Sequence, residues 1–247
     1  MNDILLARMG DLVEKATKVG AAASKFLTPA EAASVSETFA NRRDVSVILD
    51  GGFGGAERVR AIFINSDWGE YERAKLFVAL KIQYRQQDTL GHRDILGALM
   101  ALGIKREAIG DIVVGEHFMG IVCLPEMSEF ITENLTKAGR VVLKLSSVSL
   151  DDIPSRSEDL TIKSDTVASL RLDAVLSSAF GLSRTKAAKL IVAGQVSLNH
   201  QICEKTDKEI AENALLSVRG MGRAKLMEVG NLSRKGRSFI KIGVYGR

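Results

Sequence analysis

The hydrophobic positions of the first 73 residues predict two helices and two strands. Near the N-terminus, apolar side chains recur at the spacing of a single helix face, at Leu5, Met9, Leu12, Val13 and Ala16. A second helix is predicted to begin at Thr28-Pro29-Ala30-Glu31, because threonine can cap, proline suits the first helical position and Glu31 completes a capping box. Apolar runs at 45–49 and 59–64 predict strands joined by the turn-rich segment 50–55. We therefore expect a helix-hairpin unit over residues 1–73.

The next 77 residues show a different alternation of elements. The pattern predicts a strand, a helix, two strands, a helix and a strand, in that order, at residues 75–84, 92–102, 111–114, 117–124, 125–137 and 141–148. Gly103 and Gly139 are placed to end the two helices. This is the β-α-β-β-α-β order of a ferredoxin-like domain, which we assign to residues 74–150. The aromatic motif of an RNA-recognition sheet is missing from its strands.

A polar segment separates this domain from the rest of the chain. Residues 149–169 contain Pro154 and several acidic side chains but few large apolar ones, and this predicts a linker at 151–168. Within it, Thr161-Ile162-Lys163 has the character of a short strand.

Residues 169–247 are predicted to form a small α+β domain, which makes the whole chain an α+β protein. An apolar stripe from Leu172 to Ala179 predicts a helix that ends at Gly181, and Ser183 is placed to cap a second helix that stops at Gly194. Strands are predicted at 196–198, 216–218 and 239–244, with a turn at 199–200.

The distribution of charge adds a functional signal to this picture. The formal net charge is +4, but residues 168–247 carry 14 Lys/Arg against 6 Asp/Glu, whereas residues 1–167 carry 20 against 24. A compact basic segment attracts polyanions, and nucleic acid is the expected one. The alternative is a basic surface that only serves solubility.

Composition excludes several other classes of protein. Apolar residues are 46% and charged residues 26%, as in ordinary globular domains. The longest apolar run, 95–104, is about half the length of a membrane-spanning helix, and we expect no signal peptide and no membrane association. Cys123 and Cys203 form no CxxC pair, and the three histidines lack metal-ligand spacing. We expect a cytoplasmic protein, monomeric, without metal or cofactor.

The C-terminal segment resembles the small RNA-binding domain named after ribosomal small-subunit protein S-four. The resemblance runs through RLD at 171–173, FGLSR at 180–184, the A..LI..G.V.LN run at 188–199 and RGMGR at 219–223. It implies that two short helices and the adjoining strand loop form one face that grips structured RNA, with Arg184 and the 219–225 loop as main contacts. Basic side chains would neutralise phosphates there, and glycines beside arginines allow close approach of the backbone.

The resemblance and the basic positions together give a set of predicted RNA-binding residues. They are Arg171, Ser183, Arg184, Lys186, Lys189, Asn199, Arg219, Arg223, Lys225, Arg234, Lys235 and Arg237. Asp173 needs a separate interpretation, because pseudouridine synthases use an aspartate in an RLD sequence. Here the sequence continues into a helix and not into T-S-G, so we expect Asp173 to favour the positive end of that helix instead of acting in catalysis.

Over nearly its full length the chain resembles the bacterial YlmH family. The segments that carry this resemblance are 26–31, GGFGGAERVR at 51–60 and GHRDILGALMALGIKREAIGDIVV at 91–114. It implies a role in ribosome-associated quality control: binding of the large ribosomal subunit with stalled peptidyl-tRNA, and support for C-terminal tailing of the nascent chain, with a tailing factor as a further partner. The residues by themselves indicate a non-enzymatic binder of structured RNA.

Two other motifs have weaker chemical interpretations. The GGFGG segment could cradle phosphate, but phosphate loops lead into a helix and this one leads into a predicted strand, so a wide hairpin is favoured. Arg58 and Arg60 beside it are candidate RNA contacts. His92-Arg93-Asp94 copies the start of a kinase catalytic loop, but Leu99 stands where asparagine is required, so these residues are expected in the first turn of a helix. A rim contact with RNA through Arg93, Lys105 and Arg106 is an open alternative.

Two rival functions are also left open by the sequence. One is an RNA-modifying enzyme with its active site in the first 150 residues. The other is a ribosome-recycling or assembly factor that carries the same RNA-binding module but does not support tailing.

Overall fold

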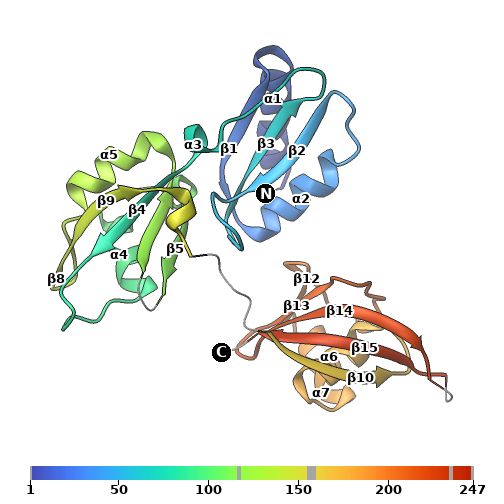
Figure 1. The fold of residues 1–247 in the computed structure, drawn as a ribbon. Coiled ribbons are helices and arrows are strands. Elements are labelled where there is room, and N and C mark those ends of the chain that lie inside the picture. Colours follow the sequence, from blue (N-terminus) through green and yellow to red (C-terminus); the bar gives the residue numbers. More distant parts are fainter. Residues whose placement is uncertain (1, 116–117, 155–159, 234–235, 246–247) are drawn as a thin grey trace. The chain divides into compact units, whose positions relative to one another are not determined.

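The computed structural model describes residues 2–115, 118–154, 160–233 and 236–245 (Figure 1). The chain divides into two compact units, residues 1–156 and 157–247. No helix among the described residues is long and apolar enough to cross a membrane.

The N-terminal part of the first unit is a three-stranded antiparallel sheet with two helices. The elements are α1 (Asn2–Val19), β1 (Ala21–Leu27), α2 (Pro29–Phe39), β2 (Val45–Asp50) and β3 (Val59–Asn65), and the strand order is β1-β3-β2. The predicted capping box is confirmed: the Glu31 N–H donates to Thr28 Oγ1 at 3.3 Å, and Glu31 Oε2 accepts from the Thr28 N–H at 2.7 Å. Apolar residues of both helices pack on the sheet, and the Phe39 ring meets the Phe63 ring edge-on at 5.4 Å.

This part contains one strand more than the predicted helix-hairpin unit. Strand β1 pairs with β3 from Ala21 opposite Ile64 to Leu27 opposite Val59. Its side chains alternate between buried and partly exposed over most of its length, as in a strand with one face in the core.

The second part of the first unit has the predicted ferredoxin-like order. Its elements are α3 (Arg73–Leu76), β4 (Val78–Gln83), α4 (His92–Ala101), η1 (Arg106–Ala108), β5 (Ile109–Val114), β6 (Met119–Cys123), α5 (Pro125–Asn134), β7 (Lys137–Ala138), β8 (Val141–Val142), β9 (Lys144–Val148) and η2 (Leu150–Asp152). The main sheet has the antiparallel order β5-β6-β4-β9, in which the first and third strands of the motif lie side by side at the centre. A core of residues from both parts of the unit joins the two sheets, with Phe26 of β1 and Phe77 before β4 at a ring distance of 5.9 Å.

Several predicted boundaries in this domain are wrong. The strand predicted from residue 75 begins at Val78, because residues 73–76 form a helical turn. The helix predicted to reach residue 137 ends at Asn134, and Gly139 with φ of +58° lies in the turn of the β7–β8 hairpin. The predicted start of the next-to-last strand at His117 lies outside the described residues.

The second unit is a six-stranded antiparallel sheet with two helices. Its elements are β10 (Leu160–Val167), α6 (Leu172–Phe180), α7 (Arg184–Val192), β11 (Val196–Leu198), β12 (Gln201–Ile202), β13 (Leu215–Val218), β14 (Gly222–Leu232) and β15 (Ser238–Tyr245). The strand order is β10-β15-β14-β13-β11-β12. Buried side chains of α6 and α7 share one core with Leu226, Ile240 and Ile242, so both helices lie on the same face of the sheet (Figure 1). We call the opposite side the open face.

The linker predicted at 151–168 is too long. Strand β10 pairs with β15 along its whole length, from Leu160 opposite Tyr245 to Val167 opposite Ser238. Most of its side chains are exposed, which explains why the sequence has the polar character of a linker. Backbone pairing with β15 makes it a strand, because an edge strand needs only one partner.

Candidate nucleic-acid interface

Helix α7 presents a group of exposed basic side chains in the second unit. The predicted cap is confirmed, because Ser183 Oγ accepts from the Lys186 N–H at 3.2 Å. Ala187 and Ile191 anchor the helix in the core, whereas Arg184, Lys186 and Lys189 are exposed. Arg219 is also exposed and adjoins the end of the helix, where its backbone N–H donates to the Gln195 carbonyl at 3.0 Å. We call Arg184, Lys186, Lys189 and Arg219 the helix patch.

Asp173 connects this patch to helix α6. It lies in the first turn of α6 with its side chain 9% exposed, and its carboxylate accepts from Arg184 Nη2 at 2.8 Å and from Arg171 Nε and Nη2 at 3.2 and 3.3 Å. Burial raises the pKa of Asp173, but the hydrogen bonds and charges of Arg184 and Arg171 outweigh this effect and hold it below its usual value. The carboxylate therefore stays ionised and fixes one edge of the Arg184 guanidinium, whose side chain is 54% exposed.

Two other predicted contacts have structural tasks at turns. Asn199 adopts a φ of +48°, and its Oδ1 accepts from the Leu215 N–H at 2.8 Å, which ties the β11–β12 turn to β13. The guanidinium of Arg237 donates to Thr166 Oγ1 at 3.0 Å and to the Thr166 carbonyl, linking β10 to the chain before β15. Arg234 and Lys235 lie outside the described residues.

Arg223 and Lys225 do not lie in a loop, as the resemblance implied. Strand β14 begins at Gly222, and Ala224 and Leu226 point into the core shared with the helices. Because side chains alternate along a strand, Arg223 and Lys225 point to the open face. Arg223 and Lys225 thus lie on the opposite side of the sheet from helix α7. Sequence reasoning missed Tyr245, whose ring lies 4.9 Å from the Arg223 guanidinium, because a single sequence carries no signal for this cross-strand pair.

The arginines near the GGFGG segment are held inside the first unit. Arg60 is buried, and it donates to the Ser24 carbonyl at 2.6 Å and to the Leu76 carbonyl. Arg58 donates to the carbonyls of Ile109 and Phe26, both at 3.1 Å. These donors are engaged inside the unit, so the structure lends no support to the interpretation of either residue as an RNA contact.

Of the three residues considered for a rim contact with RNA, Arg106 is engaged inside the first unit. Arg106 donates to the carbonyls of Ile109 and Gly110 at 2.6 and 2.9 Å, and burial lowers its pKa to about 10. Arg93 and Lys105 are exposed. Asp94 caps α4 by accepting from the Gly91 N–H at 2.8 Å, which confirms the expected position in a first helical turn.

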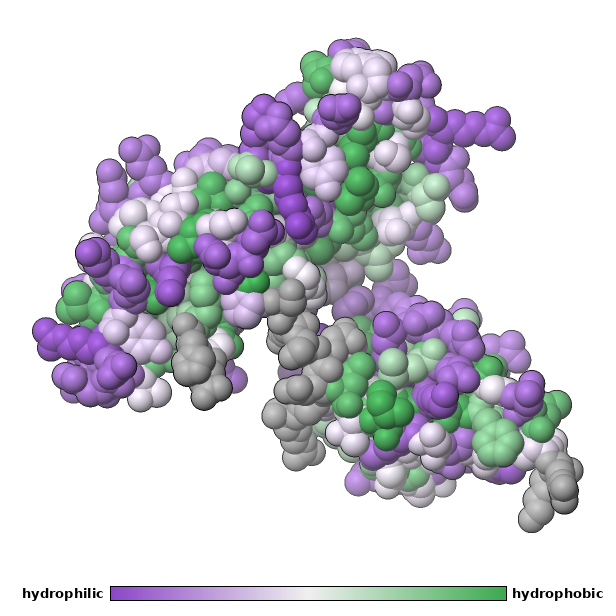
Figure 2. Space-filling view, in the orientation of Figure 1, coloured by the Kyte–Doolittle hydropathy of each residue, from purple (hydrophilic) through white to green (hydrophobic). Residues whose placement is uncertain are grey.

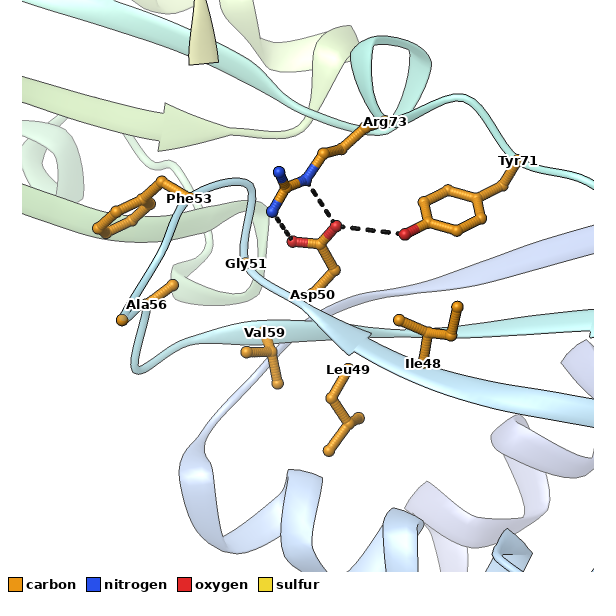
Figure 3. A pocket seen from close by; sticks show the side chains of 10 residues that line it. Ile48, Leu49, Asp50, Gly51, Phe53, Ala56, Val59, Tyr71 and Arg73 are labelled. Carbon is orange, nitrogen blue, oxygen red and sulfur yellow. Dashed lines mark hydrogen bonds and ion pairs between the residues drawn. The ribbon is translucent and has the colours of Figure 1, made fainter. Parts of the chain in front are cut away.

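The segment between β2 and β3 forms a wide hairpin beside a polar pocket of about 440 Å³ (Figure 3). At its mouth the Asp50 carboxylate accepts two hydrogen bonds from Arg73, both at 2.8 Å, one from the Gly52 N–H at 2.8 Å and one from the Tyr71 hydroxyl at 3.5 Å. Burial raises the pKa of Asp50, but the bonds from Arg73 and Gly52 outweigh it and lower the pKa overall. The ionised Asp50 carboxylate already accepts the Gly52 N–H, which a bound phosphate would need as a donor. This disfavours the interpretation of the loop as a phosphate cradle. Within the described ranges, no three His, Cys, Asp or Glu side chains are grouped so that they could hold a metal ion.

Comparisons with known proteins cover most of the chain. Three family models match: "YlmH, N-terminal" at residues 4–68, "Putative RNA-binding domain in YlmH" at 74–152 and "S4 domain" at 170–216. The chain is 34% identical over 215 residues to the Ribosome-associated protein quality control protein P2 of Bacillus subtilis (strain 168), covering 85% of this chain and 82% of that relative. A solved structure, the cell division protein ylmH from Streptococcus pneumoniae, shares the fold with a TM-score of 0.52 at 22% identity, over 62% of this chain and 94% of that one. The family resemblance found in the sequence is thus confirmed, and the chain belongs to the YlmH family.

Proposed function

We propose that this protein is a non-enzymatic RNA-binding factor of ribosome-associated quality control. In this proposal it binds the large ribosomal subunit that carries stalled peptidyl-tRNA, as a monomer, and supports C-terminal tailing of the nascent chain. The name of the Bacillus subtilis relative supports the ribosomal role, and the match to a family model described as a putative RNA-binding domain supports the binding of RNA. The observation that carries the proposal is the helix patch, in which Asp173 holds Arg184 at the surface beside two exposed lysines.

The chemistry of the patch suits structured RNA. Helical RNA is recognised mainly through its phosphates and its shape, and a row of exposed cations on a capped helix meets that requirement. Lys186 and Lys189 are one helical turn apart, so both ammonium groups can reach the same stretch of backbone. Arg184 adds a planar guanidinium that can donate two parallel bonds to one phosphate.

Sedimentation of the tagged full-length protein from cell lysate tests this function. We expect it to travel with free large subunits enriched in peptidyl-tRNA, and Arg184→Ala to lose most of that association. Arg43→Ala removes an exposed arginine from the other unit and serves as the matched control. Unchanged association of a folded Arg184→Ala protein would remove the helix patch from the proposal.

The RNA that sediments with the protein separates the rival roles. Association only with assembly precursors that lack tRNA would replace the quality-control role by one in assembly. Association with subunits that carry peptidyl-tRNA, without a change in nascent-chain tailing when the protein is deleted, would indicate a recycling role. A modified nucleotide that depends on the protein would indicate an enzyme.

A further inference from the structure

The open face of the second unit is built by strands that lie largely outside the matched S4 domain. That match ends at residue 216, whereas β10, β14 and β15 span residues 160–167 and 222–245. The three strands pair side by side, and the helices cover only their other face. The open face is therefore a surface added to the RNA-binding module.

Strand pairing places apolar side chains around a glycine at the centre of this face. Gly243 lies opposite Ile162 on β10 and opposite Lys225 on β14. A Cβ atom at position 243 would lie 3.0 Å from Met227 Sδ and 3.2 Å from both Cδ atoms of Leu160, so these two side chains close over the glycine. With Ile162, which is 52% exposed, they make an apolar floor in the middle of the sheet.

Aromatic rings lie at both ends of β15 on the same face. Alternation along the strand puts Phe239, Lys241, Gly243 and Tyr245 on the open face in one row. Phe239 is 51% exposed, and Tyr245 lies under the Arg223 guanidinium at 4.9 Å. Phe239 and Tyr245 are six residues apart, which at the rise of a strand is about 20 Å.

The charges of this face favour an anionic occupant. Strands β14 and β15 bring the basic side chains of Arg223, Lys225 and Lys241 to this face, together with the acidic Glu228, which pairs with Lys241 at 2.6 Å. On the side of this unit seen in Figure 2, hydrophobic and hydrophilic residues are interspersed. A protein interface core would instead be depleted in charge.

We propose that the open face binds unpaired RNA bases by stacking, as a second RNA site separate from the helix patch. Bases stack on Phe239, on the Tyr245–Arg223 pair and on the apolar floor, while Arg223 and Lys225 neutralise phosphates. Sheets that bind single-stranded RNA use aromatic and basic residues in this way and hold two or three bases. The inference rests on the proposed function, because it assumes that the second unit works on RNA.

Two RNA probes, each with full-length protein, test the inference. The probes are a fluorescently labelled 12-nucleotide oligouridine and a closed RNA hairpin with a minimal loop, and the readout is fluorescence polarisation. The variant Phe239→Leu/Tyr245→Leu keeps apolar volume but removes both rings. We expect at least tenfold weaker binding of oligouridine and less than a twofold change for the hairpin. Phe130→Leu removes a ring of similar exposure (42%) from the first unit and should change neither affinity.

The helix patch variant Lys186→Gln/Lys189→Gln distinguishes the two sites. It should weaken hairpin binding far more than oligouridine binding. Oligouridine affinity that is unaffected by loss of both rings would overturn the open-face site, while a loss of hairpin binding in the lysine variant would still support the proposed function. The inference would also be overturned if the wild type formed a dimer in analytical ultracentrifugation, Phe239→Leu/Tyr245→Leu did not, and oligouridine was not bound. The open face would then bind a second copy of the chain.

Discussion

The salt dependence of RNA binding gives a quantitative test of the helix patch. If Arg184, Lys186, Lys189 and Arg219 each neutralise one phosphate, counterion release predicts that affinity for a helical RNA falls about 150-fold between 50 and 200 mM salt. In Lys186→Gln/Lys189→Gln only two contacts remain, and the predicted fall is about 12-fold. Neither lysine ammonium makes an ion pair with the residues that the structure describes, so the folded state should be unaffected. Titration of the RNA hairpin at four salt concentrations measures the slope.

Two controls make the result interpretable. Lys186→Arg/Lys189→Arg keeps both charges and should keep the wild-type slope. The thermal unfolding midpoint of both double variants should stay within about 1 °C of the wild type, because exposed substitutions rarely change stability. A Gln variant with the wild-type slope would show that these lysines do not meet phosphates, and the reasoning from exposure and spacing would then fail.

Further predictions concern stability and reactivity. Asp173→Asn should lower the free energy of unfolding by about 1–3 kcal/mol, measured by urea denaturation, because it removes a charged acceptor from two guanidinium groups. Folding lowers the pKa of Asp173 from its ordinary value of 3.8, so its stabilising contribution should be complete above pH 3.8 and disappear as the pH falls through the folded pKa. Acid titration of stability should show this loss in the wild type but not in Asp173→Asn. Arg60→Met should destabilise the first unit by about 2–4 kcal/mol, because two buried carbonyls lose their donor, and calorimetry should show no shift in the transition of the second unit. Burial raises the pKa of the Cys123 thiol to about 12, so a thiol reagent at pH 8 should modify the half-buried Cys203 alone in the native protein and both cysteines after denaturation.

Local signals were sufficient for much of the fold. The capping box at Thr28, the cap at Ser183 and the glycine end of α6 all depend on residues within a few positions of each other, and each is present as predicted. The ferredoxin-like order also followed from periodicity, because its central strands β4 and β6 are mostly apolar and buried.

Two of the strands that the sequence did not predict in full, β1 and β10, depend on partners far along the chain. Strand β1 begins Ala-Ala-Ala-Ser, and alanine favours helix over strand, so only pairing with β3 makes it extended. Strand β10 has mostly exposed side chains and takes its conformation from β15, about 80 residues later. Neither pairing leaves a local pattern in one sequence.

The same limit applies to the candidate interface. Arginines were expected at the surface, but a long side chain can also satisfy buried carbonyls, as Arg58 and Arg60 do between the two sheets. Arg223 and Lys225 were predicted as loop residues on the basis of the resemblance, although β14 begins at Gly222. Once a segment is a strand, the alternation of side chains decides which face a residue serves, and this depends on where the strand begins.

Asp173 shows why the RLD sequence should be interpreted through its neighbours. Both carboxylate oxygens accept hydrogen bonds from guanidinium groups, and the side chain is almost fully buried at the start of α6. A general base in catalysis needs a lone pair aimed at a substrate and a pKa near the working pH, whereas this carboxylate faces two arginines and has a lowered pKa. In the proposed function, its position restricts the rotamers of Arg184 before RNA binds, which would reduce the conformational entropy lost on binding. The aspartate is thus best explained as a positioning residue for the arginine at the centre of the helix patch.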